Sequence, residues 1–280
     1  MFTKQERKEA RPSTSTGGPT AGISQRKVAL TAAIGLLVVA LLAPFALFGV
    51  LQNLVVPTDA AATVENIAAS EGLFRIGIAA FLIVIMLDIV VAWALYVLLR
   101  SVDRTLALLT AWLRLVFAAV FGYALVNLLD VAQLVGHAEQ SALQGEQLQA
   151  QVMSSISSFD NGWTGIALAI FGLHLFCLGY LLFRSAQFPG FLGVLVAIAG
   201  GGYLVGSFGM ILVPDYALTI GSFTFVGEAL LIVWLFLRAI KGFRPSAVAS
   251  LYTNPDDGVV TGVHEPAVVP SNGRRVTSKA

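Results

Sequence analysis

Six long apolar stretches, separated by short polar segments, dominate the pattern of the sequence. They are Val28–Leu51, Phe74–Leu99, Leu106–Leu128, Trp163–Phe183, Phe191–Val213 and Ala217–Leu237. A helix needs about 20 apolar residues to cross about 30 Å of hydrocarbon, and each stretch has that length. Backbone groups in lipid must be hydrogen-bonded internally, and no stretch alternates polar with apolar residues as a barrel strand does. The pattern therefore predicts an all-α integral membrane protein, a bundle of about six transmembrane helices.

Smaller features refine these helices. Pro44 lies inside the first stretch and is expected to kink it. Gly202 and Gly206 in the fifth stretch have the spacing that lets two helix backbones approach closely in a membrane. The polar segment Gly136–Ser158 is expected to form a short helix near the membrane surface. Trp163 falls near the end of its stretch, where tryptophan is typical of an interface anchor.

The distribution of Lys and Arg indicates the orientation. The segments before the first stretch, between the second and third, after the fourth and after the sixth contain Lys or Arg. The three intervening loops contain neither and are acidic. Because cytoplasmic loops carry the excess of Lys and Arg, we expect both termini in the cytoplasm. This alternation also requires an even number of helices.

Composition agrees with a membrane protein, since 57% of the residues are hydrophobic and only 12% are charged. The one cysteine, Cys177, excludes an intramolecular disulfide and a multi-cysteine metal site. The polar ends predict disordered cytoplasmic tails at residues 1–25 and 244–280, around a membrane domain of residues 26–243. The expected partners are the lipid bilayer and either a second copy of the chain or another membrane protein. Neither a nucleic acid nor a cofactor is expected.

Ionisable residues inside the apolar stretches are the candidate site residues, because each costs about 2.5–3.5 kcal/mol at the bilayer centre. Counted at about 1.5 Å per residue from the cytoplasmic helix ends, Asp88, Arg114 and Glu228 fall in one layer near the midplane. We therefore predict an ion pair of Asp88 with Arg114 at mid-depth. A second pair, of Arg75 with Asp130, is predicted at the outer edge of the membrane.

The mid-depth layer contains one more negative than positive charge. Either Glu228 is protonated, because burial disfavours a charged carboxylate, or a cation or proton shares the site. The second alternative describes a proton- or cation-linked site in a carrier. The other reading, a structural ion-pair network that fixes the register of the helices, is favoured, because three charges alone do not make a transporter.

His174 lies in the fourth stretch, and two alternatives are open for it. With Asp160 and Asn161 near the outer end of the same helix, it could form a polar outer cluster that holds a ligand. The favoured alternative is a packed, hydrogen-bonded histidine. The other two histidines, His137 and His264, lie in a loop and a tail, which argues against haem held by two histidines or a histidine zinc site. No metal site is therefore predicted.

Several strings of residues resemble those of a known family. They are Phe74–Gly77, Asp88–Tyr96, Ala111–Phe117, Gly162–Trp163, Phe171–Leu175, Gly179–Leu181, Leu192–Val194 and Gly227–Glu228. Over about residues 26–243, their order and spacing are similar to the bacterial membrane family called domain of unknown function 4386. The resemblance implies a multi-pass protein of the bacterial cell (plasma) membrane, in a family without an assigned biochemical activity. The acidic residue that the resemblance leads us to expect shortly after Gly202-Tyr-Leu is Gly206 here, which argues against an acidic site on the fifth helix.

The sequence leaves more than one function open. A structural, accessory or sensing membrane protein is favoured. The alternative is a proton- or cation-linked small-solute carrier that uses Glu228 and Asp88 around Arg114, and so small a carrier would be expected to dimerise. An intramembrane enzyme is less favoured, because the Gly-x-Ser-x-Gly, intramembrane Gly-Asp and His-Glu-x-x-His motifs do not occur. A channel is less favoured still, because the sequence has no filter-like segment or ring of charges.

Overall fold

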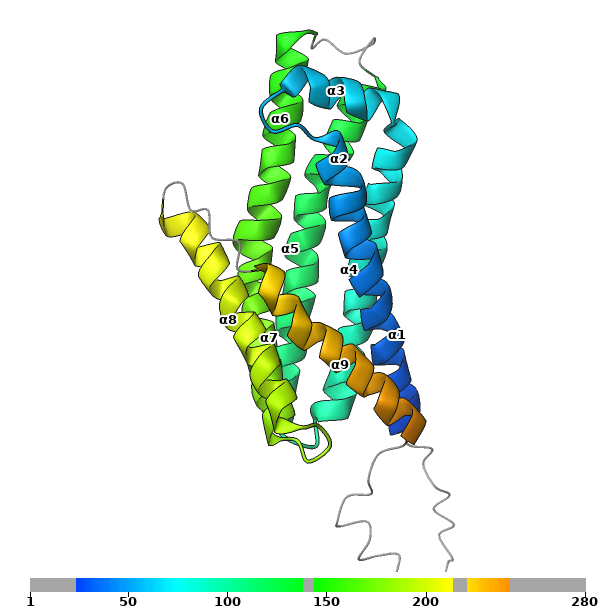
Figure 1. Cartoon of the computed structure of the whole chain (residues 1–280), viewed down its shortest axis with the longest axis vertical. Coiled ribbons are helices and arrows are strands. Elements are labelled where there is room, and N and C mark those ends of the chain that lie inside the picture. The colour runs from blue at the N-terminus through cyan, green and yellow to red at the C-terminus, as the bar shows by residue number, and fades with distance from the viewer. Residues whose placement is uncertain (1–23, 138–143, 214–220, 242–280) are drawn as a thin grey trace, which may run out of the picture. The chain divides into compact units, whose positions relative to one another are not determined.

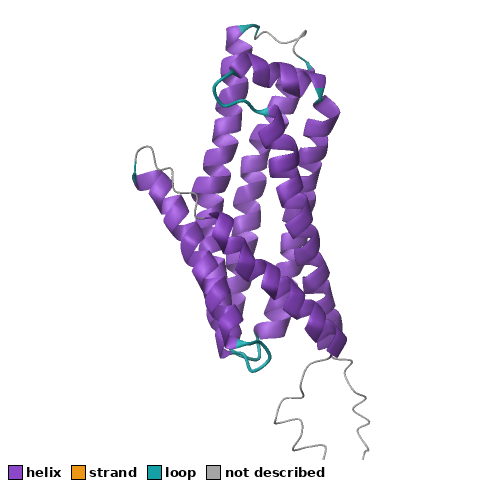
Figure 2. Ribbon diagram, in the orientation of Figure 1, coloured by secondary structure: helices purple, strands orange, loops and turns teal. Residues whose placement is uncertain are grey.

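The computed structural model describes residues 24–137, 144–213 and 221–241, and these residues form helices joined by short loops (Figures 1 and 2). The helices are α1 (Gln25–Pro44), α2 (Gln52–Leu54), α3 (Ala60–Ala69), α4 (Glu71–Leu99), α5 (Arg104–Gly136), α6 (Glu146–Asp160), α7 (Leu168–Arg184), α8 (Gly190–Leu212) and α9 (Gly221–Lys241). Two π-helical segments, Phe45–Leu51 and Asn161–Ala167, join α1 to α2 and α6 to α7.

The all-α membrane architecture is confirmed. Within the described ranges, five helices are long and apolar enough to cross a membrane, and they cover the first five predicted spans. They are Gln25–Leu54, Glu71–Leu99, Arg104–Gly136, Glu146–Arg184 and Gly190–Leu212. The 21-residue helix α9 stands where the sixth span was expected. The count of six and the cytoplasmic termini stay predictions, and the two predicted disordered tails fall almost entirely outside the described residues.

The two longest helices of the described part extend well beyond the length that a bilayer requires. Helix α5 has 33 residues, and the continuous helix Glu146–Arg184 has 39, so at about 1.5 Å per residue they are about 50 and 58 Å long. The helix predicted within Gly136–Ser158 forms as α6, but it is not a short helix of its own, because it continues directly into the fourth span. Leu148, Val152 and Ile156 of α6 are buried at a spacing of four residues, which gives α6 an apolar face against α5 and α3.

Local capping and backbone chemistry explain where several helices begin and change. Asp59 and Asp103 each accept a hydrogen bond of 2.9 Å from the backbone N–H three residues later, which caps α3 and α5. Pro44 lacks an N–H, and it is the last residue of α1 before the π-helical segment Phe45–Leu51. The structure thus changes helix type at the position where the sequence predicted a kink.

Helices α7 and α8 share the closest backbone contact of the described part. A Cβ atom added to Gly193 would lie 2.5 Å from the carbonyl oxygen of Gly179, and one added to Gly200 would lie 2.5 Å from that of Gly172. Only glycine fits at such distances. The predicted close packing thus occurs, but at these glycines, because a Cβ on Gly206 would meet nothing within 4 Å among the described residues.

Candidate functional site

A buried ion pair joins α4 to α5. The guanidinium of Arg114 donates from Nε at 2.9 Å and from Nη2 at 2.5 Å, and both hydrogen bonds go to Oδ1 of Asp88. Each side chain is only 2% exposed, so the pair is shielded from lipid by protein. The structure thus brings together the two residues that depth counting had paired. Charged residues at this depth need such partners, because lipid offers none.

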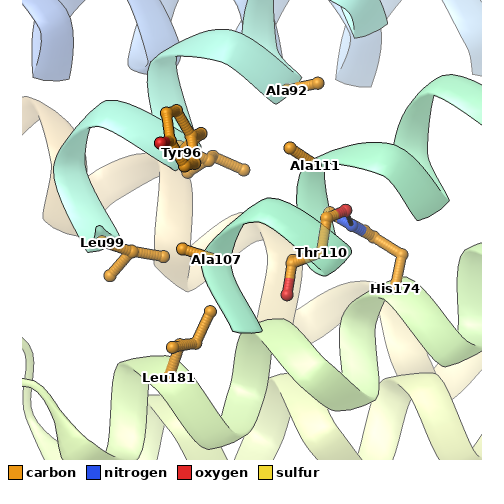
Figure 3. Close-up of a pocket in the computed structure, with 9 residues that line it drawn as sticks. Ala92, Tyr96, Leu99, Ala107, Thr110, Ala111, His174 and Leu181 are labelled. Carbon is orange, nitrogen blue, oxygen red and sulfur yellow. Dashed lines mark hydrogen bonds between the residues drawn. The ribbon is translucent and has the colours of Figure 1, made fainter. Parts of the chain in front are cut away.

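His174 of α7 completes this network. Its Nδ1 lies 2.8 Å from the backbone oxygen of Thr110, and its Nε2 lies 3.3 Å from Nη1 of Arg114. The carbonyl can only accept and the guanidinium can only donate, so Nδ1 carries the proton and Nε2 accepts. The imidazole is therefore neutral. Figure 3 shows Thr110 and His174 side by side, at a pocket that has no room for a water molecule.

A separate cavity of about 190 Å³ lies in the middle of the bundle. Its wall is built by α1, α4, α5, α7, α8, α9 and both π-helical segments. Most of the wall is aliphatic or aromatic, with Ala40, Val84 and Ile232 among the aliphatic residues. Phe48 belongs to the wall and is 57% exposed, so the wall reaches the lipid-facing surface beside α1. Figure 1 shows α9 crossing the bundle obliquely toward α1, with which it is in contact.

Two carboxyl groups and one guanidinium form the charged part of this wall. They belong to Asp88, Glu228 and Arg114. Oε1 of Glu228 accepts a hydrogen bond of 3.3 Å from the hydroxyl of Tyr203, and Glu228 forms no ion pair with any described residue. Both hydrogen bonds to Asp88 end on Oδ1, so Oδ2 accepts none from the described residues. The cavity therefore offers free carboxylate oxygen from two directions.

Aromatic rings cover the cavity on the side of α6. Trp163 stacks on Phe121 with ring centroids 5.4 Å apart, and the pair continues into Phe81 and Phe159. Phe171 joins the same cluster through Phe117, and the guanidinium carbon of Arg114 lies 5.5 Å from its ring centre. The cluster is extensively packed and excludes water from this end of the cavity.

The sequence of the chain matches a known protein family. The family described as "Domain of unknown function (DUF4386)" matches residues 31–239. The chain belongs to this family. An uncharacterised protein of Archaeoglobus fulgidus is similar, with 34% identity over 168 residues, which is 60% of this chain and 85% of that relative. No solved structure matches the chain.

The outer polar cluster predicted for this DUF4386 protein does not form. Asp160 accepts a hydrogen bond of 3.0 Å from Thr164, whereas His174 is fully buried beside Arg114. Fourteen residues of helix, about 21 Å, separate Asp160 from His174. Asn161 begins the π-helical segment at the same outer level as Asp160. The grouping was wrong because it was based on position in one helix, whereas the partners of His174 come from α5.

The predicted outer pair of Arg75 with Asp130 is also wrong. Nε of Arg75 donates to Glu71 at 2.7 Å, and Nη2 donates to the backbone oxygen of Ala132 at 3.3 Å. Asp130 is exposed and forms no ion pair with a described residue. Glu71 lies one helical turn before Arg75 on α4, so the pair forms within one helix without fixing a second one.

Sequence reasoning missed two residues of the DUF4386 cavity. Tyr203 was noticed only as part of a glycine-rich string, and Trp163 was interpreted as an interface anchor. Counting from the start of α8 would have placed Tyr203 about 20 Å from the predicted cytoplasmic side, near the depth of Glu228. No signal in the sequence indicated that Trp163 points into the bundle. Among the described residues, no group of three or more His, Cys, Asp or Glu is placed to hold a metal ion.

Proposed function

We propose that this protein is a membrane-embedded binding protein with an accessory or sensing role, and that its ligand is a small, largely apolar molecule. The observation that supports the proposal is the mid-membrane cavity of about 190 Å³, lined by apolar and aromatic side chains with a few polar groups. Ligand sites in proteins commonly have this composition. The charge pattern of the loops supports both termini in the cytoplasm. The resemblance to a bacterial membrane family supports a location in the plasma membrane of a bacterium.

The size of the cavity limits the ligand. An apolar cavity of about 150 Å³ binds benzene, which has six non-hydrogen atoms. By proportion, a cavity of about 190 Å³ suits a molecule of about eight non-hydrogen atoms. Such a molecule could enter from the bilayer, because the wall reaches the lipid-facing surface at Phe48.

Binding without transport is favoured over the carrier by the packing around the cavity. The network of Asp88, Arg114 and His174 ties α4, α5 and α7 together, and the glycine contact ties α7 to α8. A carrier must move such elements against one another to expose a site on each side of the membrane. The carrier stays the second candidate, because Glu228 lines the cavity. An intramembrane enzyme is disfavoured, since no Ser, Thr, Cys or His belongs to the wall among the residues that the structure describes.

Filling the cavity is expected to abolish ligand binding. Ala40 lines the cavity, and an Ala40→Phe variant places a ring into the space that the ligand needs. The probe is 4-fluorobenzyl alcohol, added to the purified protein in detergent micelles and followed by fluorine NMR. The parent protein should give a bound resonance distinct from the micelle resonance, and the Ala40→Phe variant should lose it.

The matched control is Ala119→Phe, because Ala119 is exposed on α5 at a similar depth and does not line the cavity. It adds the same ring to the lipid-facing surface and should leave the bound resonance unchanged. A bound resonance that persists in Ala40→Phe, or is absent from the parent, would rule out the cavity as a binding site. Uptake of a bound probe into proteoliposomes, absent in Ala40→Phe, would instead support the carrier.

A further inference from the structure

The charges around the cavity do not balance. Asp88 and Glu228 supply two carboxyl groups, Arg114 supplies one positive charge, and His174 is neutral by its two hydrogen bonds. No other described wall residue is ionisable except Tyr203, which donates to Glu228. A carboxylate without a positive partner is costly in a low-dielectric interior. A positively charged ligand would supply the missing partner.

The hydrogen-bonding groups that face the cavity favour a donor. Arg114 uses three of its five N–H groups on Asp88 and His174, and its charge is already paired with Asp88. Oδ2 of Asp88 is an acceptor without a donor among the described residues, on a side chain that is itself 98% buried. Glu228 adds a second oxygen, since its one hydrogen bond with a described residue ends on Oε1. An ammonium group has three donors and no acceptor, which fits these two carboxylates.

The rest of the wall fits an organic cation better than a bare metal ion. Calcium takes six to eight oxygen ligands, and magnesium takes about six. Two carboxyl groups in an otherwise apolar cavity fall short of either. Aromatic rings instead attract an organic cation through their faces, and Trp163 and Phe171 both belong to the wall. These two rings and the aliphatic residues of the wall also offer apolar surface for the rest of an organic ligand.

On this geometry we propose that the cavity selects a small organic amine, with the ammonium group between Asp88 and Glu228 and the apolar body under the aromatic rings. This selectivity rests on the proposed binding function, and it assigns Glu228 and Asp88 as the residues that choose the ligand. The Asp88–Arg114 pair then has two roles, because Oδ1 holds α5 while Oδ2 faces the ligand.

Comparing an amine with an alcohol of the same shape tests this selectivity. The probes are 4-fluorobenzylamine, which is protonated at pH 7, and 4-fluorobenzyl alcohol, both titrated into the parent and followed by fluorine NMR. The amine should bind at least about tenfold more tightly than the alcohol, because only the amine pairs with the carboxylates and the ring faces. In a Glu228→Gln variant the amine should lose most of this advantage over the alcohol, because the amide carries no charge to pair with the ammonium group.

A bound alcohol resonance in Glu228→Gln, at whatever affinity, shows that this variant is folded, and Ala40→Phe gives the micelle background for each probe. Equal affinity of the parent for both probes would overturn the proposed selectivity and leave the binding function standing. A preference for the amine that survives in Glu228→Gln would likewise overturn it. Binding of neither probe to the parent would contradict the binding function itself.

Discussion

An Arg114→Met variant is expected to be less stable than the parent by about 3–5 kcal/mol, which is the usual cost of breaking a buried ion pair by removing one partner. Asp88 would remain 1% exposed with no donor for Oδ1, since both of its described hydrogen bonds come from Arg114. His174 would lose the donor to Nε2 as well. Methionine fills a similar volume, so the loss reports on charge and hydrogen bonds more than on a cavity.

The measurement is the free energy of unfolding, or the melting temperature, of the purified protein in one detergent. Arg100→Met is the matched control, because Arg100 is exposed after α4 and should melt close to the parent. A double variant, Asp88→Asn with Arg114→Met, should recover much of the loss, since neither member of the broken pair then leaves a charge behind. If Arg114→Met had the same melting temperature as the parent, the pair would contribute nothing to stability.

Helix positions and depths could be predicted from the sequence because the bilayer fixes both. Hydrocarbon thickness determines how many apolar residues a span needs, and the rise per residue converts position into depth. This arithmetic placed Asp88 and Arg114 at one level, and the structure has them in contact. Applied to His174 from the cytoplasmic end of α7, it gives ten residues, as for Arg114 in α5, and so the same layer.

Positions across the bundle could not be predicted in this way. Depth gives height in the membrane but neither the rotation of a helix nor its distance from its neighbours. Glu228 lies in the same layer as Arg114 and lines the same cavity. Its hydrogen-bond partner is nevertheless Tyr203, whereas Arg114 pairs with Asp88. The cavity itself depends on how α1, α8 and α9 meet, which no local pattern encodes. The predicted partner of Arg75 was wrong for a simpler reason. Arg75 pairs with Glu71, which lies one turn away on the same helix.

The sequence also could not show which glycines lie at a helix contact. The sequence drew attention to Gly202 and Gly206, which have the four-residue spacing of many membrane helix contacts. The α7–α8 contact instead uses two pairs spaced by seven, Gly172 with Gly179 and Gly193 with Gly200. Seven residues make nearly two helical turns, so each pair lies on one face. With so many glycines in α8, spacing alone could not decide which of them meet a neighbour.

Replacing Gly200 by alanine is therefore expected to destabilise the protein by about 1–3 kcal/mol or more, as overpacking of a close contact does. The new Cβ would lie 2.5 Å from the carbonyl oxygen of Gly172 and 2.6 Å from the backbone nitrogen of Phe176. Backbone atoms cannot rotate away as a side chain can, so α8 would have to move from α7. Unfolding of the purified variant in detergent measures the loss.

Gly206→Ala is the matched control on the same helix, and the opposite sign is expected. A Cβ there meets nothing within 4 Å among the described residues, and alanine is favoured over glycine in a helix by up to about 1 kcal/mol. Because α8 also carries Tyr203 into the cavity, Gly200→Ala should weaken binding of 4-fluorobenzylamine, whereas Gly206→Ala should not. Equal stability of the two variants would contradict the close glycine contact. Unaltered amine binding in Gly200→Ala would show that the α7–α8 contact does not shape the cavity.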